Sequence, residues 1–154
     1  MNYDLLYTML NTESVSGGEI PLQKKVAAYM REAGFNVDTD KTGNVIAHIN
    51  EKSAVKVLMS GRLDEIGFRE TYISENGMIH VNKAGFIRPE LMQGKRVTVL
   101  GKKRITGVMG ILLKDGNVRT DVALKDMYID CGFTTDKQAA EWIKPGDFVT
   151  YTYA

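Results

Sequence analysis

The short stretch from Gly61 to Glu65 (GRLDE) concentrates charged side chains that could take part in chemistry. Asp64 and Glu65 supply two carboxylates, and Arg62 places a guanidinium two positions before Asp64. A guanidinium has no lone pair to give to a metal and stays protonated at any ordinary pH. Residues two apart on an extended segment share a face, so Arg62 and Asp64 are expected to pair. The alternative is that Arg62 binds an anionic ligand.

Two other kinds of catalytic site fit the residues poorly. Adjacent carboxylates on an extended segment point to opposite faces, so Asp64 and Glu65 cannot flank one glycosidic bond at about 5 to 9 Å. His48 and His80 are the only histidines, and Cys131 is the only cysteine. None of the three has a second ligand at the short spacing typical of zinc sites. Each histidine is therefore interpreted as a surface or packed residue.

The composition is that of an ordinary globular protein and disfavours two classes of partner. Of 154 residues, 44% are hydrophobic and 25% are charged, with a formal net charge of +1. Neither sign forms a run that would follow a phosphate backbone or an anionic bilayer, so no nucleic-acid or membrane partner is expected. One cysteine cannot form an intrachain disulfide, and no signal-like segment begins the chain. A cytoplasmic location is expected.

Helices and then strands are predicted in the first part of the chain. Apolar residues at helical spacing predict a helix over residues 5–10, and Pro21 begins a second helix that ends at Gly34. The period then changes, and residues 44–49 and 55–59 predict two strands, of which the second (VKVLM) is the more buried. This order of elements predicts α/β layering.

From Ile66 onward the pattern becomes almost wholly β, which predicts a small barrel or sandwich. Turn signals separate short β-branched segments at residues 75–77, 101–103 and 115–117. A late helix is predicted after Thr135, which stands in capping-box spacing with Gln138, and a last strand at residues 147–153. The glycines of the stretch 107–110 lack a P-loop lysine and predict a bend or bulge. The two domains are placed at residues 1–68 and 69–154.

Six short stretches, taken together and in order, carry a resemblance to a known family. They are SVSG at 14–17, TGNVI at 42–46, LDEIG at 63–67, GKRV at 94–97, YID at 128–130 and PGDFV at 145–149. They resemble the dimetal aminopeptidases that include the TET particles, glutamyl aminopeptidases and proteins labelled endoglucanase or cellulase M.

The resemblance implies a fold and a pair of metal ions. In that family an inserted β-rich domain, which mediates dimer contacts, interrupts an α/β/α catalytic domain that holds two divalent ions, zinc or cobalt. We therefore expect a partial α/β/α catalytic-type layer followed by a small β-barrel-like dimerisation-type domain. The resemblance covers only the first part of the family's length. The bridging ligand, the catalytic glutamate and most other ligands belong to the remainder.

One departure from the family pattern bears directly on function. The family has a metal-binding histidine two positions before an aspartate that orients the site, and here Arg62 stands in the histidine's place while Asp64 remains. We therefore expect no metal or other cofactor to bind to this chain alone, and Asp64 to be a vestige of a catalytic site.

Three readings of function follow. The first is a truncated or fragmentary aminopeptidase relative, a pseudoenzyme that is inactive alone. The second is a non-enzymatic assembly or regulatory module that binds itself or a full-length peptidase. The third is one half of a split aminopeptidase. The expected partner is another copy in a homo-oligomer, or a complementary peptidase chain.

Overall fold

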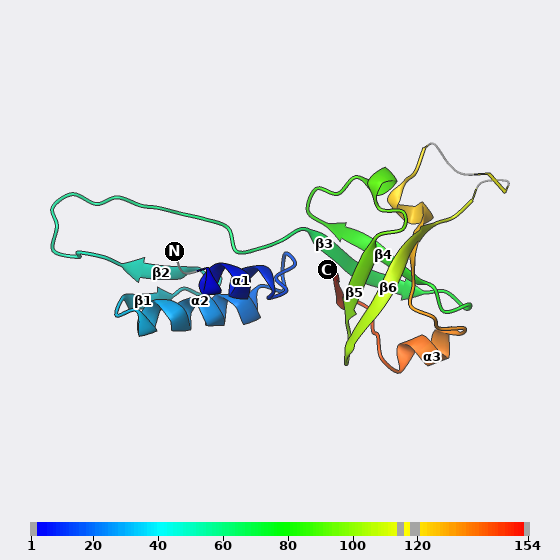
Figure 1. Ribbon diagram of the computed structural model, residues 1–154, viewed down its shortest axis with the longest axis horizontal. Coiled ribbons are helices and arrows are strands. Elements are labelled where there is room, and N and C mark those ends of the chain that lie inside the picture. Colours follow the sequence, from blue (N-terminus) through cyan, green and yellow to red (C-terminus); the bar gives the residue numbers. More distant parts are fainter. Residues whose placement is uncertain (1–2, 114–115, 118–120, 153–154) are drawn as a thin grey trace. The chain divides into compact units, whose positions relative to one another are not determined.

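The chain divides into two compact units, Met1–Glu65 and Ile66–Ala154 (Figure 1). The computed structural model describes residues 3–113, 116–117 and 121–152. The boundary expected from sequence, after residue 68, falls inside strand β3 (Gly67–Ile73), which belongs to the second unit. In the described part of the chain, no helix has both the length and the apolar character needed to cross a membrane.

The first unit contains two helices and a two-stranded antiparallel sheet. The helices are α1 (Asp4–Leu10) and α2 (Ile20–Glu32), and the strands are β1 (Asn36–Thr39) and β2 (Val45–His48). Pro21 lies in the first turn of α2, where its missing N–H costs nothing. Gly34 ends the helix with a φ of +88°, a left-handed conformation that favours glycine.

The N-terminal core is small and is centred on α2. Leu22 and Val26 of the predicted apolar face are buried, whereas Tyr29 is 47% exposed. Ala27 of α2 is also buried, and Val15 and Val37 from the flanking segments complete the buried apolar set among the described residues. The first unit thus has a small apolar core, which leaves little apolar surface against which further elements could pack.

The prediction of a strand at residues 55–59 is wrong. This segment belongs to neither a helix nor a strand. Its apolar side chains are 75 to 91% exposed. A short apolar run becomes a strand only when neighbouring strands satisfy its backbone and cover its faces. Within the described residues of the first unit, β2 pairs with β1 and not with residues 55–59. Strand β1 was not predicted from the sequence.

The second unit is a closed antiparallel barrel of six strands, as the sequence predicted when it favoured a barrel or sandwich (Figure 1). Its order is β3-β4-β7-β6-β5-β8. The remaining strands are β4 (Ile79–Ala84), β5 (Arg96–Leu100), β6 (Arg104–Ile111), β7 (Met127–Asp130) and β8 (Phe148–Tyr151). Two 3₁₀ turns, η1 (Pro89–Leu91) and η2 (Leu124–Asp126), and helix α3 (Asp136–Ala140) lie between strands.

Apolar side chains fill the barrel interior, as expected for a barrel of this size. The completely buried ones come from every strand: Phe68, Ile79, Val97, Val99, Met109, Met127, Ile129 and Val149. Trp142, just after α3, packs against the same core, which favours the core role over an interface role for part of its ring.

The bend or bulge predicted at the glycines of residues 107–110 is not present in β6, and these glycines have another structural role. The pairing of β6 with β5 and β7 runs without a register shift. A Cβ at Gly107 would lie 2.5 Å from Ile129 Cγ2 and 2.6 Å from Cys131 Sγ. Gly107 is therefore required by close packing of β6 on β7.

Two predicted turns and the late helix are present. Gly77 and the residues after Leu100 connect hairpins, whereas the third predicted turn includes residue 115, which lies outside the described residues. Thr135 begins α3 by accepting a hydrogen bond from the Gln138 N–H at 3.2 Å. This is the N-cap half of the predicted capping box. The Gln138 side chain reaches back to the Thr134 N–H at 3.0 Å, one residue before the N-cap.

Candidate functional site

The backbone around Asp64 is held by the loop before α2. Val15 and Glu65 form an isolated parallel bridge. The Glu65 N–H donates to the Ser14 carbonyl at 2.9 Å, and the Ser16 N–H donates to the Glu65 carbonyl at 3.3 Å. These contacts join segments that are far apart in the sequence, and they place the Ser16 hydroxyl beside the Asp64 side chain.

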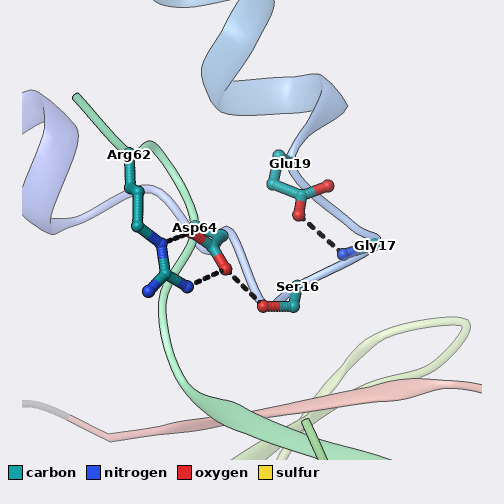
Figure 2. Close-up of polar contacts among 5 residues, drawn as sticks. All are labelled: Ser16, Gly17, Glu19, Arg62 and Asp64. Carbon is teal, nitrogen blue, oxygen red and sulfur yellow. Dashed lines mark hydrogen bonds and ion pairs between the residues drawn. The ribbon is translucent and has the colours of Figure 1, made fainter. Parts of the chain in front are cut away.

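Both oxygens of the Asp64 carboxylate accept hydrogen bonds from two neighbours (Figure 2). Arg62 donates from Nε to Oδ1 at 2.8 Å and from Nη2 to Oδ2 at 2.7 Å. Ser16 donates from its hydroxyl to the same Oδ2. The two-point contact is the geometry in which an arginine binds a carboxylate best. The pairing expected from sequence is therefore present, although residues 61–64 belong to no strand.

The ion pair shifts both of its members further toward their charged forms. Hydrogen bonds from Arg62 and then Ser16 lower the pKa of Asp64 to about 2, although its partial burial acts in the opposite direction. The hydrogen bond with Asp64 and its charge raise the pKa of Arg62. Only 17% of the Asp64 side chain is exposed, against 80% for Arg62. Asp64 is thus an anion at every physiological pH, and its charge is already neutralised.

The other acidic groups near this segment have separate partners. Glu19 accepts a hydrogen bond from the Gly17 N–H at 2.7 Å and so closes its own loop (Figure 2). Glu65 accepts from the Ser14 N–H at 3.1 Å. Asp64 and Glu65 therefore face different groups, which agrees with the rejection of a glycosidase pair.

The residues present do not fit the two metal ions that the resemblance implies. Within residues 3–113, 116–117 and 121–152, no three His, Cys, Asp or Glu side chains come together as a metal-binding group. At the position of the expected histidine, Arg62 brings a permanent positive charge and no lone pair. Both oxygens of Asp64 already accept hydrogen bonds from Arg62 or Ser16.

The two histidines and the cysteine have other environments. His48 lies on β2 and contacts Asp38 Oδ2 at 3.0 Å on an exposed face. His80 is buried, and its ring stacks on Tyr72 with centroids 4.2 Å apart. Burial lowers the pKa of His80 and raises that of Cys131 to about 12.

Ser16 is the functional neighbour that sequence reasoning missed. It belongs to the SVSG stretch, but no local pattern connects it with an aspartate 48 positions later. Only the pairing of the two backbone segments brings them together.

Comparison with known proteins identifies the family to which this fold and site belong. The model of the M42 glutamyl aminopeptidase family matches residues 43–153. The chain therefore belongs to the M42 family.

Individual relatives agree with this assignment. A lysyl aminopeptidase from Pyrococcus furiosus is 27% identical over 92% of this chain and 42% of its own length. The structure of a TET aminopeptidase from the marine sediment archaeon Thaumarchaeota archaeon SCGC AB-539-E09 is 30% identical with a TM-score of 0.84, over 96% of this chain and 43% of that one. The TET1 peptidase of Pyrococcus horikoshii, described as assembling into a tetrahedron or a large octahedral shell, is 25% identical with a TM-score of 0.83. It matches over 97% of this chain and 46% of that one.

The chain thus spans less than half the length of the relatives that it matches. The match includes both units, since nearly all of this chain is covered. What the remainder of those longer chains contributes is not part of the fold described above.

Proposed function

We propose that this chain is an M42-family relative without peptidase activity of its own. The ion pair between Arg62 and Asp64 carries the proposal, because it puts a fixed cation where the family pattern has a metal-binding histidine. A two-metal hydrolase needs several carboxylates and histidines to hold its ions and a general base to activate the bridging water. One aspartate with both oxygens engaged does not meet that need.

An assay with added metal tests this proposal. Aminoacyl-p-nitroanilides are incubated with the chain and with an Arg62→His variant, each with added Zn²⁺ or Co²⁺. We expect no release above the buffer rate from either protein, because the substitution restores only one of several ligands. Equilibrium dialysis against Zn²⁺ supplies a second readout, and the lysyl aminopeptidase of Pyrococcus furiosus serves as positive control. Metal-dependent activity of the unmodified chain would overturn the proposal.

A second candidate function is non-enzymatic assembly, with a second copy of this chain or with a full-length peptidase. The observation that favours it is the segment of residues 55–59, whose apolar side chains are 75 to 91% exposed. In a strand, the adjacent side chains of Val57 and Leu58 would point to opposite faces, so cover would be needed on both sides. A second layer of structure meets this need better than one added strand does. We therefore propose that the first unit is part of an α/β/α layer.

The partner in this assembly is a second copy or a longer M42 chain that supplies the missing cover. The assembly described for the Pyrococcus horikoshii peptidase, a relative of this chain, supports the proposal that this chain also forms oligomers. The barrel is proposed to supply dimer contacts in the same assembly. A cytoplasmic location belongs to this proposal as well, because a single cysteine suits a reducing compartment.

Light scattering after size exclusion, at several protein concentrations, tests assembly. A Val57→Lys/Leu58→Lys variant is expected to shift the protein toward monomer, because burying either ammonium group is costly. Phe86→Lys, at an 82% exposed position of the barrel unit, adds a charge away from residues 55–59. Because the barrel is itself proposed to supply dimer contacts, monomer formation in this variant as well would assign the association to the barrel and not to residues 55–59. A stable monomer at all concentrations, both alone and mixed with a full-length relative, would contradict this second function.

The third possibility, one half of a split peptidase, is the least supported. Even with a complementary chain, the site would retain Arg62 in the place of its first ligand. Activity that appears only when a complementary chain is added would favour this possibility over the other two.

A further inference from the structure

Glu70, in the middle of β3, is a buried acidic residue that the proposed function does not use. Only 2% of it is exposed, and it lies on the inward side of a strand that also buries Phe68. Neither Oε1 nor Oε2 has a hydrogen-bond partner among the described residues. An ionised carboxylate in such a place loses its hydration without compensation, which is among the most costly ways of burying a side chain.

The backbone of Glu70 forms one of the junctions that close the barrel. Its N–H donates to the Asp147 carbonyl at 2.8 Å, and its own carbonyl accepts from the Gly146 N–H at 3.0 Å. These two bonds attach β3 to the turn immediately before β8. The register of β3 against β4 shifts between Glu70 and Tyr72, so Glu70 also stands at an irregularity of the sheet.

Among the residues that the structure describes, the only charge acting on the Glu70 carboxyl is the negative one of Asp147. In the turn, Asp147 is negative, and its Oδ2 accepts from the Lys144 backbone N–H. On β4, the residue opposite Glu70 is Val81. The next residue back on β4, His80, stacks on Tyr72, and burial lowers its pKa toward the neutral form.

In the described parts of β8 and α3, which also pack on β3, no counter-charge acts on Glu70 either. β8 begins with Phe148, whose ring lies under the guanidinium of Arg69, 4.5 Å away. Helix α3 buries Ala139, leaves Asp136 half-buried and exposes Lys137.

The electrostatic surroundings agree with the geometry. Burial raises the pKa of Glu70 above its ordinary 4.5, the Gly146 backbone N–H acts in the opposite direction, and the charge of Asp147 adds to the rise. Because the folded state holds the proton more tightly than the unfolded chain, Glu70 contributes most stability below pH 4.5. That contribution is lost as the pH rises from 4.5 through the higher pKa of the folded state.

We propose that Glu70 is a pH-sensitive latch of the barrel, closed when its carboxyl is neutral and weakened when the carboxyl ionises beside the turn that joins β3 to β8. The latch is a property of the second unit and does not depend on the proposed function. It predicts that ionisation of Glu70 lowers the free energy of unfolding of the barrel as the pH rises from mildly acidic to neutral.

The single tryptophan makes the test specific to the barrel, because Trp142 packs against the barrel core. Urea unfolding of the full chain is followed by Trp142 fluorescence between pH 4.5 and 8.5, for the unmodified chain and for Glu70→Gln and Glu70→Val. Glu70→Val copies the residue that faces it, Val81. Glu75→Gln, at an exposed position on the same hairpin, is the control.

We expect the urea midpoint of the unmodified chain to fall with rising pH relative to both Glu70 variants, and Glu70→Val to have the highest midpoint at pH 8. The Glu75→Gln curve should run parallel to that of the unmodified chain. Parallel curves for the unmodified chain and Glu70→Val would overturn the proposal. Should the buried amide of Glu70→Gln prevent folding, the valine variant and a ¹³C titration of the Glu70 carboxyl still decide. A carboxyl that titrates in the folded chain at its ordinary 4.5 would overturn the latch as well.

Discussion

Arg62 binds both carboxylate oxygens of Asp64, with Nε 2.8 Å from Oδ1 and Nη2 2.7 Å from Oδ2. The first prediction concerns the charge state that this contact imposes. In an Arg62→Ala variant, the pKa of Asp64 should rise from about 2 toward its ordinary 3.8, since its largest cause is removed. Ser16 still donates, so the return should be incomplete. A ¹³C titration of the Asp64 carboxyl measures the change.

The control for this titration is another arginine with the same local arrangement. Arg88 donates from Nε to Glu90, two positions later, at 2.9 Å. An Arg88→Ala variant should leave the titration of Asp64 unchanged. If Asp64 titrated near 2 in Arg62→Ala as well, Ser16 and the backbone, not the guanidinium, would be holding the charge.

The sign of the pH effect at Asp64 is opposite to that at Glu70. A carboxyl whose pKa is lowered on folding contributes stability above its unfolded value, 3.8, and loses it as the pH falls toward 2. Arg62→Ala should therefore lose less stability than the unmodified chain over that acid range. Because 80% of Arg62 is exposed, the difference at neutral pH should be small.

A second prediction separates two glycines of β6. Gly107→Ala should destabilise the barrel by about 1 to 3 kcal/mol, the usual cost of overpacking a core, because its Cβ would lie 2.5 Å from the buried Ile129. Gly110→Ala should cost less, because its nearest neighbours are outer atoms of the half-buried Tyr128 ring, which has room to move. Urea unfolding followed by Trp142 fluorescence compares the two. Equal costs would contradict this account of Gly107.

Features of the fold that depend on residues close together in the sequence could be predicted from the sequence alone. Thr135 and Gln138 are three positions apart, and their capping interaction appeared as expected. The alternation of apolar residues in the barrel strands likewise reflects only the local rule that successive side chains face opposite sides. Such features need no knowledge of what lies across the sheet.

Features that depend on distant partners were missed or wrong. Residues 55–59 have the composition of a buried strand, but the described part of the first unit provides no neighbour for them. Ser16 meets Asp64 only because the backbones of two distant segments pair. Arg62 and Asp64, by contrast, are two residues apart, so their pairing could be predicted from an extended backbone alone.

The last prediction concerns the reactivity of Cys131, which packs against the barrel core. Burial, followed by the charge of Asp130, raises the pKa of its thiol to about 12, so almost no thiolate is present at pH 8. Iodoacetamide should therefore alkylate the folded chain on the order of a thousandfold more slowly than the urea-unfolded chain, as measured by intact mass. Gly107→Ala should accelerate the reaction, because the new methyl group would lie 2.6 Å from Sγ and displace it, whereas Gly110→Ala should not. Equally fast labelling of folded and unfolded protein would show that the thiol is accessible and ionised, against the packing described for β6 and β7.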